Sequence, residues 1–306
     1  MALTLLKRLA GAALILLGVA AVTFLLLYGL PADPAAMIAG RSATAASIAA
    51  VRHQLGLDLP LPEQFWRYLA GLAHGDLGRS YIQRTAVGTL IAARLPATLV
   101  LMVCGIGVEV ALGLTLGVLA AVRRDRALDR AVMTLSFVGV SAPQFIVALL
   151  LLYVFAAQLG WLPMSGYGTP AHAVLPALTL GLLGAGWYAR MVRSAMVDVL
   201  DRDYVRTARA KGLSAGRVVL RHALPNALLP IVAMIGIDVG QFMGGVVVVE
   251  AVYGWPGIGQ LAFQAIQQVD VPIIMGVTLV SALAVVLGNL LADLAAPLLD
   301  PRIRAR

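Results

Sequence analysis

Four carboxyl side chains interrupt long apolar runs of this sequence: Glu109, Asp238, Glu250 and Asp293. An ionisable group in such a run is costly to place in hydrocarbon and usually faces the interior of a helix bundle or a water-filled route. None of the four has an obvious basic partner within its own run. The pattern therefore predicts acidic positions inside a membrane-embedded bundle.

The run that contains Asp238 has a glycine at every fourth position, at Gly236, Gly240 and Gly244. These glycines form one stripe on a helix and allow a second helix to approach closely, whereas Asp238 and Gln241 lie roughly opposite the stripe. One face can then pack while the other borders a polar route for a solute. A hydrogen bond from Asp238 to a neighbouring helix explains its presence equally well, so both interpretations stand.

Three further residues complete the predicted translocation pathway. Asn289 and Asp293 are four residues apart and share a helix face, although hydrogen bonding between helices is the simpler explanation for this pair. Glu250 lies near the outer end of its run, where solvation alone can account for it. Together with Asp238 and Gln241, these residues are the pathway candidates.

Several kinds of chemistry lack the residues they need. The two lysines, Lys7 and Lys211, do not form the Gly-Lys-Ser/Thr sequence of a phosphate-binding loop, so we expect ATP and Mg²⁺ to be used by another chain. There is no His-Glu-x-x-His zinc motif and no Gly-x-Ser-x-Gly nucleophile. The single cysteine, Cys104, cannot build a disulfide or a cysteine metal site. We therefore predict no catalytic residue, no metal and no cofactor bound by this chain.

The elements that position these side chains must be membrane helices. Of the 306 residues, 60% are hydrophobic and 12% charged, against about a quarter charged in a soluble domain. Six apolar segments are long enough to cross about 30 Å of hydrocarbon as helices. They cover residues 9–30, 97–122, 131–159, 174–191, 228–252 and 273–299. The first resembles a signal peptide but is long for one, so we favour an uncleaved helix; Pro143 should bend the third, and the fourth is the weakest.

The 23 basic residues alternate between successive loops. They precede the first span, lie between spans two and three and between spans four and five, and form the tail, whereas residues 160–173 and 253–272 carry none. This asymmetry predicts that both termini are cytoplasmic. Six arginines in residues 31–96 do not oppose it, because loops longer than roughly 60 residues escape the rule. The net charge of +8 thus reflects topology, and we expect no nucleic-acid partner.

Two polar segments stand apart from the spans. Residues 31–96 are predicted to form an extracytoplasmic insert with some helix. Residues 190–226 form a cytoplasmic loop with a helix over 198–211, a break at Gly212, and a second helix over 215–224 that Ser214 caps and Pro225 ends. Both helices of this loop are amphipathic. The pattern alone fits a helix on lipid headgroups as well as a docking element for a partner.

The cytoplasmic loop resembles the signature loop of bacterial ABC importer permeases. That signature reads Glu-Ala-Ala, three residues, Gly, nine residues, Ile, one residue, Leu-Pro, and Gly212 and Leu224-Pro225 match it at the right separation. Arg206 stands in place of Glu, Thr207 in place of the first Ala, and a histidine in place of Ile. These departures are similar to the dipeptide/oligopeptide/nickel branch. Residues 55–58, 75–80, 244–257, 289–293 and 300–304 also resemble that branch, so the resemblance covers nearly the whole chain.

The resemblance implies an all-α, polytopic membrane protein with six transmembrane helices and the type I ABC importer permease architecture. Its parts would be residues 1–30, the insert 31–96 and the core 97–306. It would lie in the bacterial cytoplasmic (inner) membrane among lipid, with a second homologous permease, two ATP-binding subunits and an extracytoplasmic substrate-binding protein. Coupling to the ATPase is implied for nine residues of the 190–226 loop. These are Arg206, Thr207, Ala208, Arg209, Lys211, Gly212, Leu213, Leu224 and Pro225.

The resemblance narrows the substrate to short peptides, glutathione, or nickel as a small chelate. Because the predicted pathway offers few soft metal ligands, we favour di- or oligopeptides over nickel or another metal chelate. An ion-coupled secondary carrier is a competing class, with Asp238, Glu109 and Asp293 as a relay, although no internal repeat is evident. A membrane-embedded enzyme is a third, for which no nucleophile–base pair is recognisable.

Overall fold

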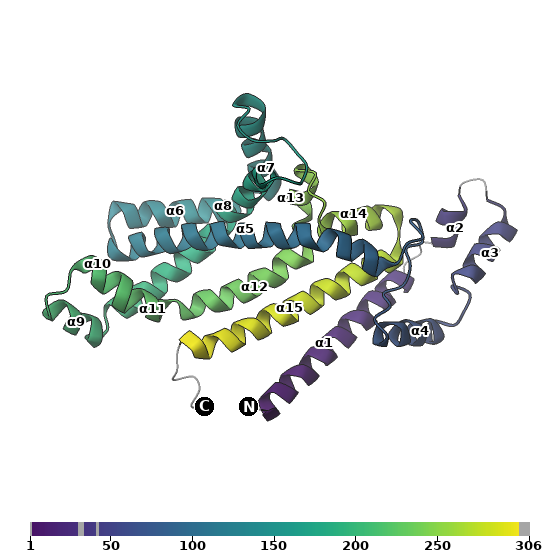
Figure 1. Ribbon diagram of the computed structural model, residues 1–306, viewed down its shortest axis with the longest axis horizontal. Helices are drawn as coiled ribbons and strands as arrows, with labels where there is room; N and C mark the ends of the chain where they lie inside the picture. The colour runs from purple at the N-terminus through teal and green to yellow at the C-terminus, as the bar shows by residue number, and fades with distance from the viewer. Residues whose placement is uncertain (1, 30–33, 41–42, 300–306) are drawn as a thin grey trace. The chain divides into compact units, whose positions relative to one another are not determined.

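The computed structural model describes residues 2–29, 34–40 and 43–299, and throughout these residues the regular elements are helices. Extended pairing in this part of the chain is limited to an antiparallel bridge between Arg79 and Ala86. The predicted all-α class is confirmed (Figure 1). The helices are α1 (Ala2–Gly29), α2 (Pro34–Ala39), α3 (Ala45–Gln54), α4 (Leu61–Ala73), α5 (Val87–Val122), α6 (Ala127–Ser141), α7 (Gln144–Leu151), the π-helix η1 (Leu152–Gln158), α8 (Pro170–Leu200), α9 (Asp203–Ala210), α10 (Ala215–Arg217), the π-helix η2 (Val218–Ala223), α11 (Leu224–Ala227), α12 (Leu229–Gly245), α13 (Val247–Val252), α14 (Ile258–Gln268) and α15 (Val271–Leu299).

Within the described residues, three helices are long and apolar enough to cross a membrane as single segments: α1, α5 and α15. Two bent pairs bring the number to as many as five. In one pair, α6 and the α7–η1 segment meet at 102°; in the other, Ala215–Ala227 and Leu229–Met243 meet at 53°. The remaining predicted span, residues 174–191, lies within the 31 residues of α8, which is long enough but less apolar. The structure thus supports a polytopic membrane protein.

The bend predicted at Pro143 is confirmed and is a complete break. Helix α6 ends at Ser141, Ala142 is extended, and Pro143 precedes the first turn of α7. Proline is acceptable there because its missing N–H would have no intrahelical partner at a helix start. Figure 1 shows α7 turned away from the direction of α6.

The chain divides into two compact units, each with its own core. The first comprises residues 1–96 and 256–284, and the second comprises residues 97–255 and 285–306. The predicted insert was expected to end at Pro96, yet α5 begins at Val87 and passes through that proline. Backbone groups that a proline frees can be satisfied locally in a membrane helix, which explains why Pro96 does not end it.

The first unit is held together by aromatic packing and one buried carboxyl. Phe24 of α1 lies 5.1 Å from Phe65 and 6.2 Å from Tyr68 of α4, measured between ring centroids. Asp270, fully buried just before α15, accepts hydrogen bonds from the Ser80 hydroxyl and from the backbone N–H of Tyr81 at 3.1 Å. These bonds tie the segment after α4 to the start of α15.

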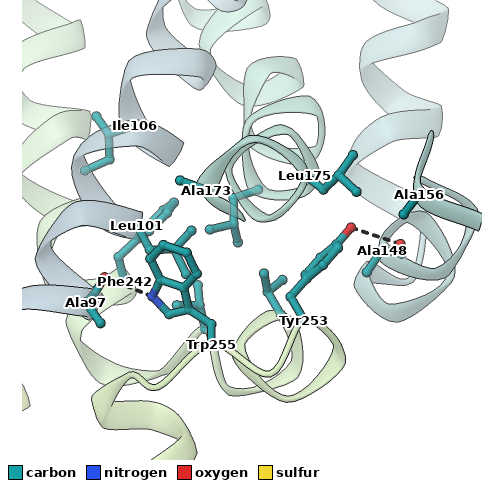
Figure 2. Close-up of a cluster of buried hydrophobic side chains, with 13 residues drawn as sticks. Ala97, Leu101, Ile106, Ala148, Ala156, Ala173, Leu175, Phe242, Tyr253 and Trp255 are labelled. Atoms are coloured by element: carbon teal, nitrogen blue, oxygen red, sulfur yellow. Dashed lines mark hydrogen bonds between the residues drawn. The ribbon is translucent and has the colours of Figure 1, made fainter. Parts of the chain in front are cut away.

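The second unit contains the larger buried cluster, shown in Figure 2. Two of its aromatic residues fix the segment after α13. The Tyr253 hydroxyl donates to the carbonyl of Ala148 in α7, and the Trp255 indole N–H donates to the carbonyl of Ala97 in α5, both at 2.9 Å. Because a buried polar group without a partner is costly, these two bonds specify one position for this segment.

Glycines set the spacing of helices in the second unit. A Cβ on Gly117 of α5 would lie 2.6 Å from the Cβ of Val192, and one on Gly186 of α8 would lie 2.6 Å from the carbonyl oxygen of Ser136 in α6. Helix α8 is therefore in near-backbone contact with both α5 and α6. The predicted close approach on α12 is confirmed at Gly240, where a Cβ would lie 2.6 Å from Val285 of α15. The surroundings of Gly244 lie outside the described side chains.

Candidate functional site

A cavity of about 560 Å³ lies within the second unit, bordered by α5, α7, α8 and α12. Apolar side chains form part of its wall. The polar side chains that line it are Glu109, Gln144, Tyr188, Asp238 and Gln241. A concave site with mostly apolar walls and a few convergent polar groups is typical of small-molecule binding, and the volume falls within the range of about 300–1,000 Å³.

Asp238 is held by a tyrosine of a different helix. The Tyr188 hydroxyl on α8 donates a hydrogen bond to the Asp238 carboxyl on α12, and Tyr188 is 1% exposed. The sequence left open whether Asp238 bonds a neighbouring helix or borders a polar route. The structure shows the bond to a neighbouring helix and places Asp238 in the cavity wall, whereas a route for the solute past Asp238 stays a prediction.

Glu109 of α5 also lines the cavity and is 5% exposed. Among the residues that the structure describes, no side chain makes a hydrogen bond or an ion pair with its carboxyl. The carboxyl lies against α8 at Gly184, where a Cβ would overlap it and would lie 2.7 Å from its Cγ. Glycine at this position therefore makes room for the acid.

The structure brings together only part of the predicted pathway. Asp238 and Gln241 line the cavity, whereas Glu250 and Asn289 do not. Glu250 is fully buried and accepts a hydrogen bond from the Thr98 hydroxyl at 3.4 Å, so the interpretation of Glu250 as a solvated end-of-span residue is wrong. The physical reason is the break at Val246, which starts a new short helix, α13, packed inside the unit. Asn289 is exposed on α15, and the side chain of Asp293 lies outside the described part.

Sequence reasoning missed Tyr188, Gln144 and Trp187 as cavity residues and did not count Glu109 among the pathway candidates. The sequence contains features that could have identified two of them, Tyr188 and Gln144. Tyr188 lies one helical turn after Gly184, which places both on the same face of α8. Gln144 directly follows Pro143, where the break in the chain turns a new helix start toward the cavity.

The predicted coupling loop forms a compact helical pair around Val205, Ala208 and Val218, which are buried together. Two boundaries differ from the prediction. The helix expected over residues 198–211 is interrupted, because α8 continues to Leu200 and α9 starts at Asp203. Pro225 does not end the second helix either: it lies in the first turn of α11, after the π-helical segment η2. A π-helical segment shifts the backbone hydrogen-bond register, which allows a proline without its N–H to follow.

Gly212 separates α9 from α10 with a φ of +76°, a conformation that glycine adopts without a steric penalty. The predicted break is confirmed, and its cause is this left-handed residue. Ser214 precedes α10 as predicted, but its side chain makes no capping hydrogen bond.

The residues predicted to couple to the ATPase divide into an exposed set and a supporting set. The exposed residues are Arg206, Thr207, Arg209, Lys211, Gly212 and Pro225. Ala208 is buried, and Leu213 and Leu224 are half-buried beneath them. Two apolar side chains are exposed among the basic ones, with Tyr204 at 45% and Leu220 at 63%. A basic surface with exposed apolar side chains is suited to a protein partner.

A buried ion pair fastens the helices that lead from the cavity toward this loop. Arg193 of α8 donates from Nε to Oδ1 of Asp129 at 2.5 Å and from Nη2 to Oδ2 at 2.6 Å. The Asp129 side chain is 3% exposed and that of Arg193 is 25% exposed. Such a two-point contact fixes both distance and orientation between α6 and α8.

Potential metal ligands are dispersed over the described residues. Over the residues that the structure describes, no group of three or more His, Cys, Asp or Glu side chains is placed to hold a metal ion.

Comparison with known proteins decides the family. The model of the binding-protein-dependent transport system inner membrane component family matches residues 113–305, and the model of the N-terminal part of such membrane components matches residues 1–102. The chain belongs to this family. It is therefore a permease subunit of a binding-protein-dependent ABC importer, a multi-pass protein of the inner membrane, and not itself an enzyme.

Curated relatives match almost end to end. The chain is 46% identical over 299 residues to a glutathione transport system permease protein of Salmonella paratyphi A, covering 98% of both chains. The proteins of the same name from Pectobacterium atrosepticum and Escherichia coli K12 are 45% and 44% identical, each over 97% of both chains.

A solved structure is similar in fold. A chain of the methionine ABC transporter MetNI, in an inward-facing conformation, aligns with a TM-score of 0.56 at 23% identity. The alignment covers 69% of this chain and 96% of that one. This likeness supports the type I permease fold that the sequence predicted.

Proposed function

We propose that this permease subunit carries short peptides, with glutathione and other di- to oligopeptides as its substrate class. The observation that carries the proposal is the cavity of about 560 Å³, whose carboxyl and amide side chains suit a hydrated zwitterion with an amide backbone. The curated relatives, named as glutathione transport permeases, support the same class.

Energy for transport comes from partner subunits in this proposal. Two ATP-binding subunits, which use ATP and Mg²⁺, dock on the exposed face of α9–α11, and a second homologous permease completes the membrane part. An extracytoplasmic binding protein delivers the substrate. The basic, partly apolar surface around Arg206 and Leu220 supports the docking position. Membership of the importer family decides against the ion-coupled carrier and the membrane enzyme.

The experiment is uptake by the complete system in proteoliposomes. The chain is reconstituted with its partner permease, ATPase subunits and binding protein, and the import of labelled glutathione, labelled dipeptides and labelled nickel is measured with and without ATP. We expect ATP-dependent import of glutathione or dipeptide that unlabelled peptide competes away. Nickel import without competition from any peptide would contradict the peptide assignment and favour a metal chelate.

A further inference from the structure

One face of helix α8 positions two carboxyl groups that come from two other helices. Gly184 and Tyr188 are four residues apart and therefore share that face. Gly184 leaves the space that the Glu109 carboxyl of α5 occupies, and Tyr188 donates a hydrogen bond to the Asp238 carboxyl of α12. Both carboxyls line the same cavity.

These two carboxyls lack a counter-charge within the described chain. Glu109 is nine-tenths buried and has no hydrogen-bond or ion-pair partner there, and Asp238 has only the tyrosine hydroxyl. The basic residue Arg190 makes no hydrogen bond or ion pair with them: its guanidinium lies 4.4 Å from the ring centroid of Trp187, which borders the cavity, and 4.8 Å from that of Phe137. Buried acidic groups without a partner are costly and commonly mark a functional position.

We propose that Glu109 and Asp238 form a subsite that receives the positively charged amino group of the substrate, with Tyr188 and Gly184 as positioning residues. This inference rests on the proposed peptide substrate. An ammonium group carries three N–H donors and can be shared between two carboxyls. A bare metal ion fits less well, because no third His, Cys, Asp or Glu ligand accompanies the pair in the described residues. The amides of Gln144 and Gln241 in the same wall can bond the peptide backbone.

The test compares glutathione with N-acetylglutathione, which lacks the positive charge on the amino group. Import of each by the complete reconstituted system is measured for the unmodified chain and for Glu109→Gln and Asp238→Asn. We expect each substitution to lower the preference for glutathione by about tenfold, the effect of losing one charge-assisted hydrogen bond. The binding protein is the same in every sample, so its own selectivity cancels from the change in preference.

A second readout needs glutathione alone. In the proposed assembly the ATPase subunits dock on the loop around Gly212, away from both carboxyls, so ATPase activity should persist in both carboxyl variants. The ATP hydrolysed per glutathione imported should then rise about tenfold. Glu109→Asp keeps the charge and should retain most of the preference. Glu63→Gln, on the exposed part of α4, is the matched control and should behave like the unmodified chain.

Positioning is tested separately at Gly184. Gly184→Ala adds a methyl group where the Glu109 carboxyl lies, so we expect it to reproduce the loss of preference seen with Glu109→Gln. Gly107→Ala on α5 is the control, since no atom lies within 4 Å of its added Cβ. Tyr188→Phe should weaken the preference less than removal of the Asp238 charge.

The outcomes separate the two proposals. Absence of any peptide import by the unmodified system would overturn the proposed function and this subsite with it. Peptide import with both readouts unchanged in Glu109→Gln and Asp238→Asn would overturn the subsite alone. Equal loss of both substrates would also overturn it, because that result indicates a structural role. If one carboxyl variant does not assemble, the other decides.

Discussion

Gly212 shows how a single backbone conformation can account for a motif residue. Its φ of +76° lies in the left-handed region, and a Cβ placed there would meet no atom of this chain within 4 Å. Internal crowding therefore does not require glycine. What requires it is the conformation itself, which costs other residues about 1–2 kcal/mol.

We expect Gly212→Asp to reduce ATP-driven uptake by about tenfold or more, since a carboxylate would project from a basic surface that is open to the partner. Membrane insertion should remain intact. The measurement is uptake together with co-purification of the ATPase subunits. Gly212→Asn, which tolerates left-handed backbone and carries no charge, separates the steric effect from the electrostatic one. Normal uptake by Gly212→Asp would argue against docking at this loop.

At the scale of elements, α8 organises the second unit. Glycines of α5 and α8 bring these helices into near-backbone contact, and Gly186 does the same toward α6. In the C-terminal part of α8, Arg193 holds Asp129 of α6 through two hydrogen bonds. One helix thus fixes the walls of the cavity and the spacing of the elements that lead to the predicted coupling loop.

Removing one member of this ion pair should destabilise the protein. Asp129→Ala leaves the Arg193 guanidinium without its carboxylate, and we expect the free energy of unfolding to fall by about 2–3 kcal/mol. The value is at the low end for a buried pair, because Arg193 is partly exposed and can recover bonds to water. Thermal unfolding of the purified permease in lipid nanodiscs measures it.

Glu63→Ala provides the comparison for that measurement. Glu63 pairs with Arg67 at 2.8 Å, but both side chains are largely exposed, so its removal should change stability by less than about 1 kcal/mol. If Asp129→Ala and Glu63→Ala lowered the free energy of unfolding equally, burial of the Asp129–Arg193 pair would contribute nothing to stability.

For the whole molecule, the placement of basic residues remains the basis for the membrane orientation. We expect single reporter cysteines at Arg126 and Gly212 to react only with reagents on the cytoplasmic side. Those at Gly75, Thr169 and Gln268 should react only from outside. The background is Cys104→Ala, which removes the native thiol. Labelling is measured with a membrane-impermeant maleimide on intact cells and on inverted vesicles.

Labelling at one of these positions is the most informative test of the predicted topology. Gly75 lies at the end of α4 in the first unit and is exposed. A cytoplasmic Gly75 would overturn the assignment of residues 31–96 as an extracytoplasmic insert and the orientation derived from the basic residues.

The sequence by itself determined the class of protein, the membrane runs and the position of the loop with the family signature. Apolar length, the alternation of basic residues and the spacing from Gly212 to Leu224-Pro225 are properties of single segments, so they can be read without knowing which segments touch. For the same reason the break at Pro143 and the glycine stripe on α12 were predictable: each follows from local backbone chemistry.

Only the tertiary structure decided which polar residues share a cavity. Glu109, Tyr188 and Asp238 come from three helices, and their meeting depends on how each helix is rotated about its axis. That rotation is set by glycine contacts such as Gly184 against Glu109 and by the break at Val246, which carries Glu250 into the core instead. A run of apolar residues specifies that a helix crosses the membrane, but the packing of its neighbours specifies which face looks inward.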